Sequence, residues 1–279
     1  MKTITQTQVK KFSIYLEEEE RSAATIDKYL RDIRKFSDWL GDDDVSKNRV
    51  LLYKKTLLET YAIASVNSML SSLNSFFSYM GRPDLKVKTV KVQRQIFVSS
   101  EKELTRAEYE RLLDEAKGRG KERLYLLMQT ICACGIRVSE VKYISVEAVR
   151  AGQAQISGKG KQRKIFLPAA LCKTLKKYAQ MKKIKSGPVF ITKNGNSPDR
   201  SNIWNDMKKL CKAAGVSEKK VFPHNLRHLF ARTYYSMQKD IVRLADILGH
   251  SNINTTRIYT QENGDIHKKQ MQRLGLFRC

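Results

Sequence analysis

The sequence predicts a mainly α-helical fold with a small antiparallel β-sheet, an α+β arrangement divided between two domains. Apolar residues recur at three- and four-residue steps along most of the 279 residues, which is the period of a helix buried on one face. The period shortens toward two only between Ile144 and Pro168. Residues 83–103 follow neither period and alternate Val with Lys, which is typical of an extended basic linker. We therefore predict a helical domain at 1–82, a linker at 83–103 and a second domain at 104–279.

The first domain is predicted to hold four helices. Ser22 is a suitable N-cap and Gly41 a suitable end for the second helix, and Gly81-Arg82-Pro83 can close the fourth but hardly continue it. The third and fourth helices are expected at about 51–61 and 66–80. The apolar positions that define the first two helices are Val9, Phe12, Ile14, Leu16, Ile26, Tyr29, Leu30, Ile33, Phe36 and Leu40.

The second domain opens on a helix-start signal. Thr105 is a candidate N-cap, and Glu108 three residues later completes a capping box. Helices are expected at about 105–117 and 120–134. Three short segments of alternating pattern then predict a three-stranded antiparallel sheet, namely 145–149, 154–158 and 163–168. Beyond Pro168 the helical period returns, with breaks at 186–188, at 194–198 and at Gly249.

The net charge of +25, with a sequence pI near 9.9, predicts a polyanionic partner. An anionic membrane surface usually calls for one basic amphipathic helix, whereas here the charge is spread along the chain, which favours nucleic acid. The first 100 residues hold 17 basic and 12 acidic residues, and the remainder holds 36 and 16. The second domain is therefore expected to carry most of the binding charge.

Composition also excludes several classes of protein. No apolar run approaches the ~20 residues of a membrane span, and the N-terminus lacks the apolar stretch of a signal peptide. We therefore expect a cytoplasmic protein with no membrane partner. The five cysteines form no CxxC pair and have no histidine at ligand spacing, so we expect reduced thiols rather than disulfides or a zinc site.

Two segments combine cations with sharp turns. In Cys134-Gly135-Ile136-Arg137-Val138-Ser139-Glu140 a helix ends at Gly135, Ser139 can cap the next helix, and Arg137 lies in the break. Taken alone, the segment favours a surface arginine beside a helix end. Gly158-Lys159-Gly160-Lys161-Gln162-Arg163-Lys164 is a basic hairpin tip that allows close approach to a backbone, or else a solvated turn.

Two further segments hold three of the four histidines. In Pro223-His224-Asn225-Leu226-Arg227-His228 the spacing of His224 and Arg227 lets both reach one phosphate from a helix face, although a surface cluster is the simpler alternative. In 248–259, Gly249 ends a helix, His250 lies in the turn, and Asn254 or Thr255 caps a helix that carries Tyr259. With twelve tyrosines in the chain, Tyr259 alone indicates nothing.

Together and in this order, the four segments resemble the tyrosine recombinase (phage integrase) family, nearest its Xer-like bacterial and archaeal members. CGIRVSE is similar to the family's first-arginine box, GKGKQRKIFLP to its lysine hairpin, PHNLRH to its His-x-x-Arg box and LGHSNINTTRIYT to its final histidine and nucleophile box. SAATIDKYLRDIRKFSDWL and SVNSMLSSLNSFFSYM resemble its helical core-binding domain more weakly, and LTRAEYERLL resembles the start of its catalytic domain. The resemblance covers nearly the whole chain.

The resemblance implies six catalytic residues. It makes Arg137 the first arginine, Lys159 the hairpin lysine, His224 and Arg227 the second pair, His250 the fifth group and Tyr259 the nucleophile. Lys161 and Lys164 are rival hairpin cations. Cys134 stands where the family often has threonine, which concerns packing, and His228 is expected to give structural support.

The implied activity is site-specific cleavage and rejoining of double-stranded DNA through a 3′-phosphotyrosine, with no cofactor and no metal. The implied partners are other copies of the chain, two on each DNA site and four in a synapse that passes through a Holliday junction, and accessory recombination or cell-division factors. The apolar run Met271, Leu274, Leu276 and Phe277 would pack on its own subunit or on a neighbour. The alternatives are DNA relaxation of the type IB topoisomerase kind and DNA binding without catalysis.

Overall fold

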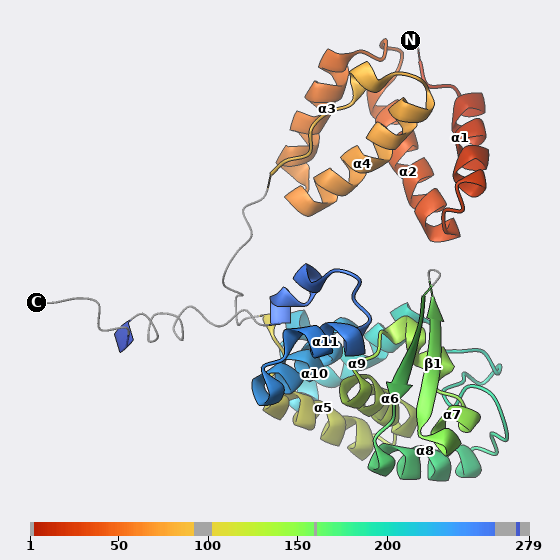
Figure 1. Ribbon diagram of the computed structural model, residues 1–279, viewed down its shortest axis with the longest axis vertical. Helices are drawn as coiled ribbons and strands as arrows, with labels where there is room; N and C mark the ends of the chain where they lie inside the picture. The colour runs from red at the N-terminus through yellow and green to blue at the C-terminus, as the bar shows by residue number, and fades with distance from the viewer. Residues whose placement is uncertain (1–2, 92–101, 159–160, 260–271, 274–279) are drawn as a thin grey trace, which may run out of the picture. The chain divides into compact units, whose positions relative to one another are not determined.

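The computed structural model describes residues 3–91, 102–158, 161–259 and 272–273. The chain divides into two compact units, Met1–Arg94 and Gln95–Cys279, each with its own apolar core. Both are mainly helical, and the second also contains an antiparallel sheet (Figure 1). The predicted fold class is confirmed. No helix among the described residues is long and apolar enough to cross a membrane.

The first unit is a helical bundle with an aromatic core. Its elements are α1 (Gln6–Glu18), α2 (Ala23–Leu40), α3 (Lys47–Thr60), α4 (Ile63–Tyr79) and the 3₁₀ helix η1 (Pro83–Leu85). Phe12 of α1 and Phe76 of α4 are fully buried and meet edge to face, with ring centroids 5.3 Å apart. Gly41 ends α2 at a φ of +59°, as the sequence predicted. The prediction of four helices is thus confirmed within the described residues.

The packed first unit extends further along the chain than the sequence indicated. Residues 83–90 were expected to begin the linker, but Leu85 and Val87 are buried in the core of this unit. Two asparagines of α4 bind the backbone of this segment. Asn74 donates to the carbonyl of Val87 at 2.8 Å and accepts from its N–H at 3.0 Å, and Asn67 does the same for Val90. Since these amides satisfy an extended backbone that has no strand beside it, residues 83–90 are fixed on α4.

The second unit is built around a central helix. Its elements are α5 (Arg106–Gly118), α6 (Glu122–Cys134), η3 (Val138–Tyr143), α7 (Val146–Ala151), β1 (Gln153–Gly158), β2 (Lys161–Phe166), α8 (Ala169–Met181), α9 (Arg200–Ala214), η4 (Glu218–Lys220), α10 (Pro223–Gln238), α11 (Ile241–Leu248), η5 (Ile253–Thr255) and η6 (Arg257–Tyr259). α6 packs against α5, α8, α9 and α10. Seven of its thirteen residues are buried, as expected for a core helix. The predicted capping box of Thr105 and Glu108 starts α5.

Within the part of the chain that the structure describes, the sheet has two strands rather than the predicted three. β1 and β2 pair antiparallel from Gln153 with Phe166 to Gly158 with Lys161. The segment 145–149, expected as a strand, forms α7 instead. Ser145 caps α7 by accepting a hydrogen bond from the N–H of Ala148, and Gly152 ends it at a φ of +71°. Val146 and Val149 are three residues apart and both buried, as on one face of a helix. Five residues are too few to distinguish the helical period from the strand period, and the caps at Ser145 and Gly152 identify the segment as a helix.

Two predicted caps are also wrong. Ser139 lies inside η3, whose N-cap is Arg137. Asn252, rather than the expected Asn254 or Thr255, caps η5, and Tyr259 lies in the separate turn η6. Both segments form short 3₁₀ turns, which keep their side chains close to the preceding helix end.

The burial of Leu85 gives a test of this longer first unit. In a Trp204→Phe background Trp39 is the remaining tryptophan and reports unfolding of the first unit. Leu85→Ala is expected to lower the free energy of unfolding in a denaturant titration by about 2–5 kcal/mol, since a fully buried leucine is removed.

Lys86→Ala is the matched control, because this neighbouring side chain is exposed and its loss should cost under about 0.5 kcal/mol. Equal, small effects of the two substitutions would mean that residues 83–90 are a linker after all.

Candidate active site

The first arginine segment lies where α6 ends. Gly135 ends α6 at a φ of +62°, and a Cβ there would overlap the ring of Phe230 on α10. Glycine is needed for both reasons, because other residues are strained at this φ and have no room here. Arg137 follows at the start of η3 with its side chain 39% exposed. The turn therefore presents Arg137 to solvent at the end of a buried helix.

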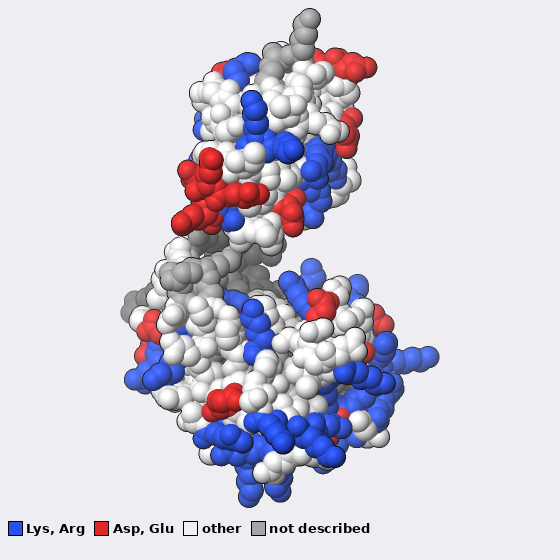
Figure 2. All heavy atoms as spheres, turned by 90° about the vertical axis from the view of Figure 1, so that its right-hand side faces the viewer, with Lys and Arg blue, Asp and Glu red and all other residues white. Residues whose placement is uncertain are grey.

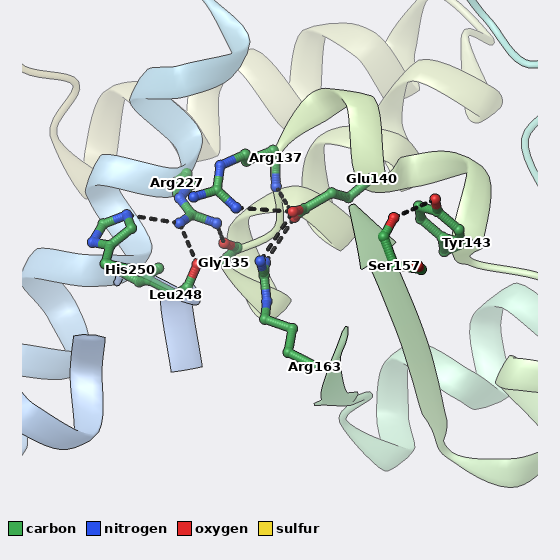
Figure 3. Close-up of polar contacts among 9 residues, drawn as sticks. All are labelled: Gly135, Arg137, Glu140, Tyr143, Ser157, Arg163, Arg227, Leu248 and His250. Carbon is green, nitrogen blue, oxygen red and sulfur yellow. Dashed lines mark hydrogen bonds and ion pairs between the residues drawn. The ribbon is translucent and has the colours of Figure 1, made fainter. Parts of the chain in front are cut away.

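A buried carboxylate holds Arg137 in this place (Figure 3). Glu140 accepts a hydrogen bond from the backbone N–H of Arg137 at 2.7 Å and another from its Nη1 at 2.9 Å. Burial alone would raise the pKa of Glu140, but the hydrogen bond from the Arg137 N–H and the charge of Arg163 outweigh it and lower that pKa. Glu140 is therefore ionised at neutral pH and anchors Arg137.

The second arginine is fully buried. Arg227 donates from Nη1 to the carbonyl of Gly135 at 2.6 Å and from Nη2 to the carbonyl of Leu248 at 2.7 Å (Figure 3). Its Nε is buried and has no hydrogen-bond partner among the described residues. Burial, reinforced by the charge of Arg137, lowers the pKa of Arg227 to about 10. The guanidinium therefore remains charged at neutral pH and joins the ends of α6 and α11.

His250 follows Gly249, which ends α11 at a φ of +65°. The Nε2 of His250 lies 3.0 Å from Nη2 of Arg227, and its Nδ1 lies 2.9 Å from Oγ1 of the buried Thr256. Because arginine can only donate, Nε2 must accept, and the proton of a neutral ring is then on Nδ1 and is donated to Thr256. This assignment fixes the tautomer of His250.

Tyr259 is packed into the same site. Its side chain is 3% exposed, and its ring meets His228 at a centroid distance of 4.8 Å and His250 at 6.2 Å. His228 in turn contacts His224, with centroids 4.6 Å apart. His228, expected as structural support, thus contacts both the predicted base His224 and the predicted nucleophile Tyr259.

The three histidines of the site are held neutral. Burial, followed by the charge of Arg227, lowers the pKa values of His224 and His250, and that of His250 falls to about 4. Burial and then His224 lower the pKa of His228 to about 4. Cations surround these rings, so a further positive charge on any of them is disfavoured. On the face of the second unit that Figure 2 shows, the patches of Lys and Arg are more extensive than those of Asp and Glu.

Five of the six predicted residues therefore meet in one place, although they come from three separate segments of the chain: Arg137, His224, Arg227, His250 and Tyr259. Lys159 lies outside the described residues, in the sequence between Gly158 at the end of β1 and Lys161 at the start of β2. The rival Lys164 is exposed on β2. Sequence reasoning assigned no role to Glu140, Arg163 or Thr256, although each lies inside one of the four segments that it singled out.

A buried, strongly cationic site with a tyrosine packed into it is suited to transferring phosphodiester bonds through that tyrosine, which is the chemistry of the tyrosine recombinases. Comparison with family models agrees. The phage integrase family model matches residues 102–265, and the phage integrase N-terminal SAM-like domain model matches residues 9–82. The chain belongs to the phage integrase family.

Relatives of similar sequence are named tyrosine recombinases. Tyrosine recombinase XerA of Thermococcus kodakarensis is 29% identical over 96% of this chain and 95% of its own length. Tyrosine recombinase XerD of Proteus mirabilis is 30% identical over 89% of this chain and 85% of its own. The match therefore extends over both units.

Solved structures share the fold. A lambda integrase dimer bound to a COC′ core site superposes with a TM-score of 0.74 at 17% identity, covering 91% of this chain and 94% of that one. The XerH recombinase bound to its difH substrate gives 0.70 at 19% identity, covering 94% and 88%. The match of the SAM-like domain also favours a recombinase over a topoisomerase, the alternative raised by the sequence.

The neutral histidines give a prediction. In a proton NMR titration, the rings of His228 and His250 should remain neutral at pH 5.5, since both pKa values lie at about 4. The unfolded chain, with histidine pKa values of about 6.5, takes up these protons first. The free energy of unfolding of the second unit should therefore decrease as the pH falls from about 6.5 toward 4.

His228→Gln removes one of these groups and should flatten that pH dependence. Titration of both rings near pH 6.5 in the folded protein would contradict the burial seen here.

Proposed function

We propose that this chain is a site-specific DNA recombinase in which Tyr259 is the nucleophile and Arg137, Lys159, His224, Arg227 and His250 assist it. The observation that carries the proposal is the gathering of Tyr259, His250 and two arginines around one buried cationic centre. The DNA substrate accounts for the net charge of +25. A chain that acts on such a substrate would work in the cytoplasm.

The bond changes balance without a cofactor. The Tyr259 hydroxyl oxygen attacks a backbone phosphorus, forming a 3′-phosphotyrosine as the bond to the 5′ oxygen breaks. The phenol proton passes to His224, whose lowered pKa keeps it neutral and able to accept. The leaving oxygen takes a proton from Lys159. Since one phosphodiester replaces another, a new 5′ hydroxyl can reverse the step on a different strand.

The arginines stabilise the transition state in different ways. Arg137 is the exposed cation and would contact the non-bridging oxygens directly. Arg227 donates from its Nη atoms to the carbonyls of Gly135 and Leu248, so it contributes its buried charge and its Nε–H, which has no partner among the described residues. For His250 to donate to a phosphate oxygen from Nε2, its ring must take the other tautomer, with Thr256 then donating to Nδ1.

We further propose that two copies bind each DNA site and that four form the synapse. Solved relatives of the same fold support this arrangement, since lambda integrase is described as a dimer on a core site and as a tetramer on a Holliday junction. Accessory factors would bind to this assembly, and residues 271–277 would pack within it. That segment lies almost wholly outside the described residues.

The nucleophile is the first test. Tyr259→Phe removes one oxygen and almost no volume, so folding and DNA binding should survive while the covalent complex disappears. The probe is a nicked suicide duplex whose sequence the protein selects from a random pool, and the readout is a protein–DNA adduct that resists denaturation.

Tyr235→Phe is the matched control, because Tyr235 is the neighbouring tyrosine on α10 and should be dispensable. Mass spectrometry of the trapped peptide names the residue directly. An adduct on any tyrosine other than Tyr259 would refute the assignment. Formation of recombinant product, rather than relaxation of supercoiled DNA alone, distinguishes a recombinase from a topoisomerase.

The general acid is the second test. Lys159→Ala should slow cleavage of an ordinary phosphodiester but be largely rescued on a substrate whose bridging 5′ oxygen is replaced by sulfur, because a thiolate leaves without a proton. Single-turnover cleavage rates on the two substrates provide the measurement. Rescue of Lys161→Ala or Lys164→Ala in its place would transfer the role to that lysine.

A further inference from the structure

Arg163 occupies a position on β2 where a cation is unexpected. It pairs with Ile156 across the hairpin and alternates along β2 with exposed Gln162 and Lys164, so its side chain lies on the inner face with Ile165. This side chain is only 16% exposed. Charged side chains are rarely buried unless they are paired, so the position requires a partner.

The partner of Arg163 is the carboxylate that also holds Arg137. Arg163 donates from Nη1 to Oε1 of Glu140 at 3.0 Å and from Nη2 to Oε2 at 2.7 Å, a bidentate pair (Figure 3). Together with the two bonds from Arg137, the carboxylate accepts four hydrogen bonds from two arginines. One negative charge is thus shared between two positive charges.

The other side of Arg163 contacts the turn that carries His250. A Cβ built on Gly249 would lie 2.6 Å from Nη1 of Arg163 and 2.7 Å from its Cδ. The guanidinium therefore lies against Gly249, the residue that follows Leu248, whose carbonyl Arg227 binds. Arg163 fills the space between Glu140 and this turn.

We propose that Arg163 is a positioning residue for the reaction, an inference that rests on the proposed function of the site. By occupying both oxygens of Glu140, it prevents this carboxylate from pairing fully with Arg137, and so leaves Arg137 charge for the phosphate. Without Arg163, Glu140 would neutralise Arg137 as a one-to-one ion pair and turn its guanidinium away from the DNA. Arg163 also supports the Gly249 turn and with it the place of His250.

The first measurement is single-turnover cleavage of the selected suicide duplex by the full chain. Arg163→Met keeps the length of the side chain and removes its charge. It should lower the cleavage rate about 10- to 100-fold, as a displaced catalytic group does, with the Kd for the duplex changed less than about 3-fold. Arg163→Lys, which keeps the charge but loses the fork, should fall between Arg163→Met and the natural chain.

Arg150→Met is the matched control, since it removes an exposed arginine from α7 and should leave the rate unchanged. It separates loss of general charge from loss of this contact.

The second measurement distinguishes positioning from mere structural support. Glu140→Gln removes the negative charge that would otherwise capture Arg137. The double variant Arg163→Met, Glu140→Gln should therefore cleave faster than Arg163→Met alone, whereas two structural losses would add and make it slower.

The proposal is overturned if Arg163→Met cleaves at the natural rate, or if the double variant is no faster than the single one. Should Arg163→Met fail to fold, a natural rate for Arg163→Lys would overturn it equally. If the natural chain itself forms no adduct on the duplex, the proposed function fails, which is a distinguishable result.

Discussion

The candidate active site depends on one buried guanidinium. Arg227 is fully shielded from solvent, and its hydrogen bonds to Gly135 and Leu248 join two helix ends that are far apart in the sequence. These carbonyls belong to the last turns of α6 and α11, where backbone acceptors lack helical partners. Arg227 thus supplies the donors that both ends need, and in doing so brings the Arg137 turn beside the His250 turn. An apolar side chain of similar volume would leave both carbonyls unsatisfied.

The same burial explains the electrical state of the site. Three arginines, Arg137, Arg163 and Arg227, surround a single carboxylate, Glu140, so the site holds an uncompensated positive charge. Burial, together with this positive charge, lowers the pKa values of the histidines, to about 4 for His228 and His250, so their rings are neutral. A neutral ring can accept a proton or donate a hydrogen bond, whereas a protonated ring can only donate. The cationic field therefore keeps the imidazoles in the form that general base catalysis needs.

Local signals in the sequence were sufficient for much of this architecture. Gly135, Gly249 and the Thr105 capping box were identified because each depends on residues a few positions apart. The clustering of Arg137, His224, Arg227, His250 and Tyr259 followed from the family resemblance, since no periodicity brings these segments together. The partners of Arg163 were not predictable, because Glu140 lies 23 residues earlier and the pairing depends on how β2 packs beside η3. The hydrogen bonds of Val87 and Val90 to asparagines of α4 were not predictable either, because these partners are also distant in the sequence and meet only through packing.

The arrangement favours the transition state over the bound substrate. A phosphodiester carries one negative charge, and its pentavalent transition state carries more, so a fixed excess of cations stabilises the second state more than the first. Fixing such charges requires anchors that do not themselves cancel them. Backbone carbonyls anchor Arg227 without cancelling its charge, because they are dipoles without net charge. The Glu140 carboxylate anchors Arg137 without fully cancelling its charge, because the same carboxylate also binds Arg163. Positive charge is thus held rigidly while most of it remains available to the DNA.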